Sequence, residues 1–336
     1  RLTEPTAVSF RWPDAPAPGE LQPLRLQPRA ALPVDDNFFT TYFTIDNTLY
    51  VLAQDGRLFA YDATGDRWVR RRDFTIRVGG MDLAGQFNGF QPTVFALNGK
   101  AYVYHQTVGG TPNPTYLSEY NPATDTWTRL GENFKTGLVG YQLAYTQGDR
   151  AYFYWRGQPD LRVFDRTTRT IEPATTSLAP GAWVTFLPVR SEPFAYFADG
   201  TGVFLSRLET TSGRLMNPNL LLPGRVSPGY ALATSVNDDV LFGSGWKTQR
   251  ASVLTPDLPT PYPFGVEVLN DVLIRYATRA NQVTGRYALT ELQTPDWSQQ
   301  VKDGNRDRAL AVRTFALDGR VFVVNPARKS LTELMF

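Results

Sequence analysis

Apolar and polar residues alternate with a period of two in short runs along much of the chain, and Gly, Asn or Asp separates many of these runs. In FALNGKAYVYHQ (95–106), two alternating runs flank Asn98-Gly99, a pair that supplies the positive φ angles of a two-residue hairpin. The run YLSEY, the turn NPATD and the run TWTRL follow. This order predicts four antiparallel strands in one twisted sheet over residues 95–130.

The same order of strands and turns recurs. It appears at 43–74 and at 144–173, where Trp68 and Ile171 occupy the place that Trp127 has in the quoted unit. Less regular copies follow at 193–218, 235–257, 267–300 and 314–336. A repeat of about 45 residues with four strands is typical of a β-propeller blade. We therefore predict an all-β propeller of four-stranded antiparallel sheets with seven blades, and six or eight blades are the alternatives.

Two of these units resemble kelch repeats. Tyr61-Asp62 precedes a polar turn and Trp68, and Tyr120-Asn121 precedes a similar turn and Trp127, as in the blades of that family. The diglycine expected after the second kelch strand is displaced into an insertion, at Gly109-Gly110. The resemblance is to bacterial kelch-repeat propellers and is carried by residues 38–175. It implies a kelch-type propeller for the whole domain.

The chain is expected to divide into a tether and one domain. Residues 1–19 are rich in Pro and Ala, which is typical of a linker, and residues 20–336 are predicted to form a single propeller. The last unit ends near its third strand, so residues 20–28 are expected to add the outer strand and close the ring. Each Trp is expected to fill the wedge between neighbouring blades, which makes Trp127 a structural residue.

Composition restricts the chemistry. With 34 Lys and Arg against 32 Asp and Glu, the formal net charge is only +2, which argues against nucleic acid or an anionic membrane as the main partner. The absence of Cys and the presence of a single His disfavour a thiolate nucleophile and a zinc or copper centre. The copper chemistry of galactose oxidase, which shares the kelch propeller, is thereby excluded. We expect no cofactor, no metal and no transmembrane span.

A binding surface is expected at one end of the central channel, where the loops between second and third strands and the connections between blades gather. Exposed aromatic and basic side chains at such a surface suit sugar stacking, peptide recognition or capture of a carboxylate. The candidate binding residues are Gln54, Asp55, His105, Trp155, Arg156, Trp246, Lys247 and Arg279. Of these, His105 is expected to be a solvated loop residue, and packing beneath loops is an equal alternative for Trp155 and Trp246. No catalytic residue is predicted.

These observations favour a non-catalytic binding or assembly module for a protein or glycan partner. A chain without Cys fits an exported bacterial protein and also a cytosolic one. We expect export to the periplasm, the outer membrane or the cell surface of a bacterium, with a lipid anchor upstream as a further expectation. One alternative is a sugar-modifying enzyme like the sialic-acid mutarotase found among kelch propellers, whose chemistry needs only Arg and carboxylate groups; Arg156 and Arg279 are the candidate arginines. A purely structural subunit of a surface assembly is the other alternative.

Overall fold

The structure of the protein is a computed structural model. It describes residues 22–35, 40–78, 81–84, 92–107, 114–155, 160–177, 183–189, 192–198, 202–223, 233–247, 267–280, 282–288 and 313–336.

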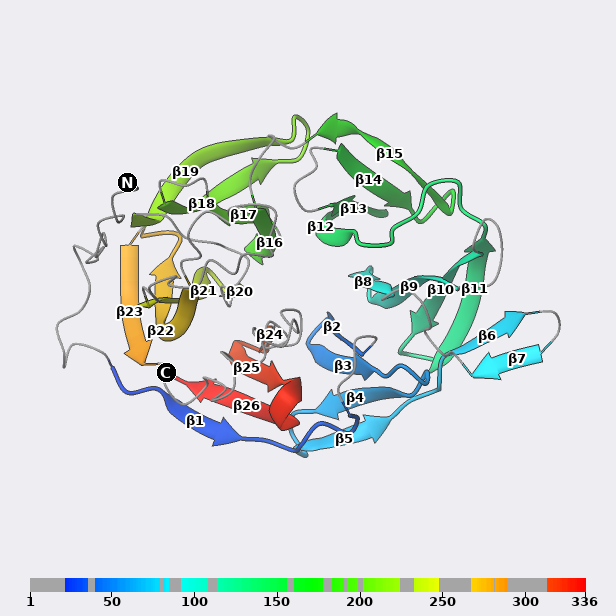
Figure 1. Cartoon of the computed structure of the whole chain (residues 1–336), viewed down its shortest axis with the longest axis horizontal. Helices are drawn as coiled ribbons and strands as arrows, with labels where there is room; N and C mark the ends of the chain where they lie inside the picture. Colours follow the sequence, from blue (N-terminus) through cyan, green and yellow to red (C-terminus); the bar gives the residue numbers. More distant parts are fainter. Residues whose placement is uncertain are drawn as a thin grey trace, which may run out of the picture.

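Within these residues, six four-stranded antiparallel sheets form a ring of blades, which confirms the prediction of an all-β propeller (Figure 1). In every blade the first strand named is the innermost. The first blade contains β2 (Thr41–Ile45), β3 (Thr48–Leu52), β4 (Leu58–Asp62) and β5 (Arg67–Arg70). The second contains β8 (Thr93–Leu97), β9 (Lys100–Gln106), β10 (Thr115–Asn121) and β11 (Thr126–Glu132). The third contains β12 (Gln142–Gln147), β13 (Arg150–Tyr154), β14 (Asp160–Asp165) and β15 (Thr170–Ser177).

The other three blades follow in chain order. The fourth contains β16 (Trp183–Val189), β17 (Glu192–Ala198), β18 (Gly202–Glu209) and β19 (Arg214–Pro223). The fifth contains β20 (Ala233–Val236), β21 (Asp239–Lys247), β22 (Glu267–Ala277) and β23 (Gln282–Ala288). The sixth contains β24 (Arg313–Leu317), β25 (Arg320–Asn325), β26 (Ser330–Met335) and, as its outer strand, β1 (Arg25–Pro28).

The sixth blade joins strands from opposite parts of the sequence. Strand β1 lies within the segment 20–28 and pairs antiparallel with β26, from Arg25 opposite Met335 to Pro28 opposite Thr332. A short 3-10 helix, η3 (Pro326–Arg328), connects β25 to β26. Strands β6 (Thr75–Val78) and β7 (Met81–Ala84) form a separate hairpin, which projects outward from the ring between the first two blades (Figure 1).

Tight turns between the two inner strands explain why the alternating runs fold as hairpins. The turns of five blades contain a residue with positive φ, namely Asp46, Asn98, Gly148, Asn237 and Asp318. The paired residues at the strand ends, such as Leu97 opposite Lys100, leave a two-residue loop between them. Asn, Asp and Gly reach positive φ more easily than other residues do, so the sequence specifies these turns locally.

The predicted number of seven blades is wrong, because two predicted units are halves of one blade. The units at 235–257 and 267–300 contribute β20 with β21, and β22 with β23, to the fifth sheet. Strand β22 is continuous for 11 residues and pairs with both β21 and β23. The sequence pattern alone predicts a boundary between blades at the long connection from β21 to β22, whereas the strand pairing places this connection within one blade.

The hydrophobic core lies between neighbouring blades, as the wedge argument predicts. Tyr50 and Phe74 of the first blade region pack with Val103 and Tyr120 of the second, and Trp127 covers this cluster from the outside. Trp68 has the same place on the cluster between the sixth and first blades. The prediction that both Trp side chains are structural is confirmed.

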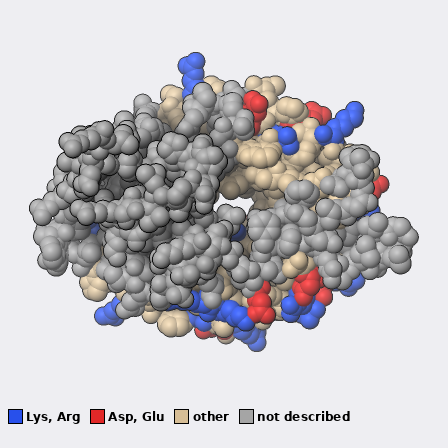
Figure 2. All heavy atoms as spheres, viewed as in Figure 1, with Lys and Arg blue, Asp and Glu red and all other residues tan. Residues whose placement is uncertain are grey.

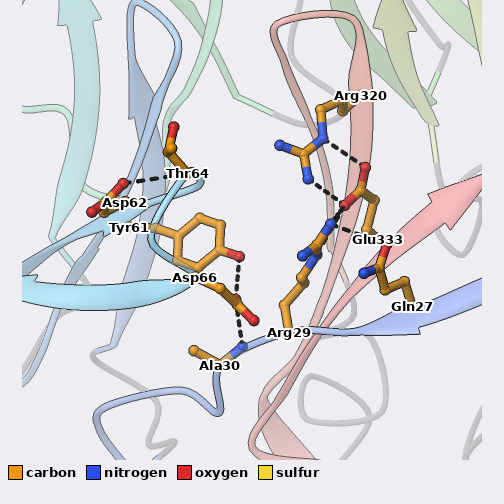
Figure 3. A network of polar contacts seen from close by, with 9 residues as sticks. All are labelled: Gln27, Arg29, Ala30, Tyr61, Asp62, Thr64, Asp66, Arg320 and Glu333. Carbon is orange, nitrogen blue, oxygen red and sulfur yellow. Dashed lines mark hydrogen bonds and ion pairs between the residues drawn. The ribbon is translucent and has the colours of Figure 1, made fainter.

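The turns before these two Trp residues also fasten the blades to each other. In what we call the first clasp, Asp66 accepts hydrogen bonds from the Tyr61 hydroxyl (2.7 Å) and the Ala30 amide (2.9 Å) (Figure 3). Trp68 Nε1 donates to the Ala30 carbonyl (3.3 Å). Ala30 follows the outer strand of the sixth blade, so the clasp holds both backbone groups of one residue from the neighbouring blade.

The second blade repeats this arrangement. In the second clasp, Asp125 accepts from the Tyr120 hydroxyl (2.7 Å) and the Arg72 amide (2.9 Å), and Trp127 Nε1 donates to the Arg72 carbonyl (2.9 Å). Arg72 follows the outer strand of the first blade. Burial and the bond to Asp125 both raise the pKa of Tyr120, so this hydroxyl remains a donor at any physiological pH.

Candidate binding surface at the loop end of the ring

The two ends of the ring differ in their connections. At one end, which we call the loop end, lie the loops between second and third strands and the connections between blades; at the turn end lie the hairpin turns. The structure places Gln54 and Asp55 in the β3–β4 loop, His105 near the end of β9, and Trp155 directly after β13, all at the loop end. Figure 2 shows an opening in the middle of the ring, with most of the described charged side chains on its outer rim.

The β3–β4 loop presents an exposed ion pair. Asp55 accepts from the backbone amide of Arg57 at 3.2 Å and pairs with its Nε at 2.6 Å. The two side chains are 48% and 40% exposed, so the pair contributes little to stability. Gln54 beside it is half-buried. This loop offers polar groups to a ligand but no apolar contact surface.

Trp155 is the most exposed aromatic side chain of the described loop end. Its side chain is 46% exposed, and its ring meets Tyr141 edge to face at a centroid distance of 5.3 Å. A Cβ placed on Gly140 would lie 3.7–3.8 Å from three atoms of the six-membered ring of the indole. Such nearly equal distances to three ring atoms mean that Gly140 lies over one face of the indole. The alternative that Trp155 packs beneath a loop is therefore wrong.

Two polar contacts hold the residues next to Trp155. Tyr154, which precedes Trp155, donates from its hydroxyl to Gln142 Oε1 at 2.9 Å. The guanidinium of Arg162 lies 4.0 Å from the centroid of the Tyr141 ring, a cation–π contact that fixes this ring from one side. The site is thus a half-exposed indole supported by Gly140 and Tyr141.

His105 contradicts the expectation of a solvated loop residue. It belongs to β9 and is only 2% exposed, stacked on Tyr116 at 5.1 Å and in edge contact with Phe74 at 5.5 Å. Burial lowers the pKa of His105 from 6.5 to about 4, and the positive charge of Arg129 adds to this shift. The imidazole is therefore neutral at pH 7 and part of the second blade's packing. The sequence pattern did extend strand β9 to this position, since YVYHQ alternates up to its end.

The remaining candidates lie in different surroundings. Trp246 and Lys247 end β21, where they pair with Val268 and Glu267, and their side chains are outside what the structure describes. Arg156 lies outside the described residues. Arg279 lies at the turn end, in the turn between β22 and β23, and pairs with Asp238 at 3.0 Å. The prediction that Arg279 lies on the loop surface is wrong, because the two predicted units around it are halves of one blade.

A buried carboxylate forms the most strongly charged network outside this surface. Glu333 is 3% exposed and accepts hydrogen bonds from Arg29 Nε at 2.9 Å and from Arg320 Nε at 2.6 Å (Figure 3). The bonds from Arg320 and then Arg29 lower the pKa of Glu333 and outweigh the opposing effect of burial. Perturbed carboxylates are common in active sites, but this one is fully engaged in fastening β1 to β25 and β26.

Neither a metal centre nor a membrane span is found in the described part of the chain. No group of three or more His, Cys, Asp or Glu side chains there has a metal-binding arrangement. No helix among the described residues is long and apolar enough to cross a membrane.

Comparison with known proteins adds information about the fold. No protein-family profile matches the chain, and no curated protein sequence matches it significantly. Among solved structures, 756 chains match significantly. One of them, the structure of YjhT, superposes with a TM-score of 0.55 at 16% sequence identity and covers 90% of this chain and 95% of that chain. At this identity the likeness shows the propeller fold alone.

Proposed function

We propose that this protein is a non-catalytic, kelch-type propeller that binds a protein or glycan partner through the loop end of its ring, as an exported protein at a bacterial cell surface or in the periplasm. The observation that carries the proposal is Trp155, a half-exposed indole with one face supported by Gly140. A half-exposed indole that a neighbouring backbone supports, at the end of the ring where loops gather, is suited to stacking on a ligand.

The two ends of the ring support this choice of surface. At the turn end, exposed polar side chains beside the turns bind one another, as in the contacts of Asn98 with Asp149 (2.7 Å) and of Arg150 with Asp165 (2.8 Å), and the exposed apolar residues there, Met335 and Phe336, lie at the end of β26. At the loop end, the half-exposed indole of Trp155 follows directly on strand β13. Binding residues on loops that a rigid scaffold positions are a common arrangement.

The absence of Cys from the sequence allows a direct test of the surface. Gln54→Cys places one thiol at the loop end, and Thr167→Cys places one at the turn end as a matched control. Each variant, labelled with a maleimide photocrosslinker, is incubated with an envelope extract of the source cells and with its glycan fraction. We expect saturable, stoichiometric capture of one partner by the loop-end label and none by the turn-end label.

Equal capture from both ends, or capture from neither, would overturn the proposal. The enzyme alternative has its own signature, because a catalyst changes its ligand. Conversion of a sugar in the presence of the protein, followed by one-dimensional NMR, would replace the binding-module proposal with a sugar-modifying activity.

A further inference from the structure

The exposed apolar surface that the structure describes is confined to a few side chains. Three large hydrophobic residues are exposed, namely Trp155 (46%), Met335 (43%) and Phe336 (47%). The last two lie at the end of the sixth blade, whereas Trp155 belongs to the third. Among the described residues of the third blade, Trp155 is therefore the one large apolar side chain that is exposed.

The groups beside Trp155 that the structure describes are small or polar. Gly140 and Gln142 are exposed, and so is Asp160, which begins β14 at the other end of the same loop. Gln142 pairs with Tyr154 and accepts its hydroxyl hydrogen, so its side chain lies on the other face of the sheet from Trp155. Asp160, one position beyond the Tyr154–Leu161 pair, is the described polar residue whose register position is next to Trp155.

This arrangement discriminates among ligand classes. A protein interface needs about 800 Å² on each partner with several apolar residues at its centre, which one indole among polar groups does not supply. A quaternary ammonium group needs several aromatic faces, but the guanidinium of Arg162 already occupies a face of Tyr141 and repels a second cation. A nucleic acid needs a basic groove, and the formal net charge of the chain is only +2.

A pyranose ring fits the remaining description. Its axial C–H groups form a flat apolar face of about the size of an indole, and its hydroxyl groups project from the rim, where they need both donors and acceptors. Resting on the function proposed above, we propose that the partner is a glycan and that Trp155 is the platform on which one of its neutral pyranose rings stacks, with Asp160 accepting a hydrogen bond from one of its hydroxyl groups.

The platform is already formed without a ligand. Gly140, with φ of +79°, lies against one face of the indole, and Tyr141 packs on the indole in a T-shaped contact while Arg162 holds Tyr141. Residues fixed in this way lose little conformational entropy on binding, which favours measurable affinity from one stacked ring.

The test uses the full chain and a printed array of defined oligosaccharides that includes cello-, malto- and chito-oligosaccharides. Every oligosaccharide bound on the array is then titrated by calorimetry against Trp155→Ala, Trp155→Phe and, as a control that removes another exposed aromatic side chain, Phe336→Ala. We expect Trp155→Ala to weaken binding by about tenfold or more, Trp155→Phe to retain most of the affinity, and Phe336→Ala to bind as the unchanged protein does.

Two results would overturn the inference while leaving the proposed function intact. One is glycan binding that Trp155→Ala leaves unchanged, and the other is binding to no array glycan together with loop-end capture of a protein by the Cys-labelled variant. Binding to no glycan and capture from neither end would overturn both proposals. Thermal unfolding of Trp155→Ala close to that of the unchanged protein shows that loss of binding is not loss of folding.

Discussion

The joint between the first and second blades differs from the joint between the second and third in the side chains that hold it. In the former, the second clasp binds both backbone groups of Arg72. In the latter, the equivalent positions are Phe164, Arg169 and Ile171, which offer neither the carboxylate nor the indole N–H. The backbone is nevertheless alike, since Arg169 has φ of 58° where the Asp of the second clasp has 52°.

The difference shows that the clasp is an addition to the fold and not a condition for it. Between the second and third blades, Phe164 packs on Phe95 at 5.6 Å and on Tyr102 at 5.3 Å, and Ile171 is 5% exposed. Apolar burial, together with side-chain contacts such as that of Asn98 with Asp149, holds this joint without a clasp. The Tyr, Asp and Trp that make two units recognisable as a repeat therefore mark a joint at which side chains also bind the backbone of the neighbouring blade.

Removal of the Trp from the clasped joint should have the largest effect. Trp127→Ala removes ring contacts to Phe74 (4.8 Å) and Tyr120 (4.9 Å) together with the hydrogen bond to Arg72. We expect a loss of about 3 kcal/mol in the free energy of unfolding, measured by chemical denaturation. Faster hydrogen exchange at the Arg72 amide should accompany it.

Trp155→Ala is the matched control for this prediction. It makes the same chemical change at a half-exposed indole outside any joint, and we expect it to cost less than about 1 kcal/mol. Equal losses in the two variants would mean that the clasp adds nothing beyond the size of the Trp side chain.

Acid should weaken the clasped joint next. His105 contacts Phe74 within this joint, and its pKa is lowered from 6.5 to about 4 by burial. Between these values the unfolded chain binds a proton that the folded protein excludes, so stability is complete above pH 6.5 and falls as the pH falls toward 4. From pH 7.5 to pH 5 we expect a loss of about 2 kcal/mol in the free energy of unfolding.

The sequence contains a single His, which makes the control simple. His105→Phe keeps an aromatic ring against Tyr116 and Phe74 and removes the titrating group. Its free energy of unfolding, whatever its value at pH 7.5, should change little down to pH 5. An equally steep loss in this variant would assign the pH dependence to other groups.

Local signals explain why the fold was largely predictable. Asn98-Gly99 and Asp318-Gly319 specify hairpins from the few residues between strands, and the residues of the two clasps recur at fixed spacing. The blade count depended on the connection between β21 and β22 instead. No local signal distinguishes a long loop within a blade from a connection between blades, because that distinction lies in which strands pair.

The candidate surface was less predictable for a related reason. The order of strands and loops is enough to place Trp155 at the loop end. For Arg279 it gives the wrong end, because two predicted units are halves of one blade and the residue lies in a turn at the turn end. His105 was misjudged because a polar residue at the end of an alternating strand can face either solvent or a neighbouring blade. The support that Gly140 and Tyr141 give to Trp155 comes from packing between a connection and a strand end, which the sequence pattern does not encode.

The smallest effect should also be the sharpest test of the comparison, because one substitution should change sign between the two joints. Asp125→Gly removes the acceptor of the Tyr120 and Arg72 hydrogen bonds, and we expect a loss of about 1.5 kcal/mol in the free energy of unfolding. Arg169→Gly removes no clasp and relieves a side chain at positive φ, so it should gain about 0.5 kcal/mol. The fourth blade already has Gly213 at the corresponding turn position, with φ of 69°. Chemical denaturation of both variants measures the two changes in the free energy of unfolding. If Arg169→Gly destabilised the protein as much as Asp125→Gly, both joints would depend on this turn alike. The distinction between clasped and unclasped blades would then fail.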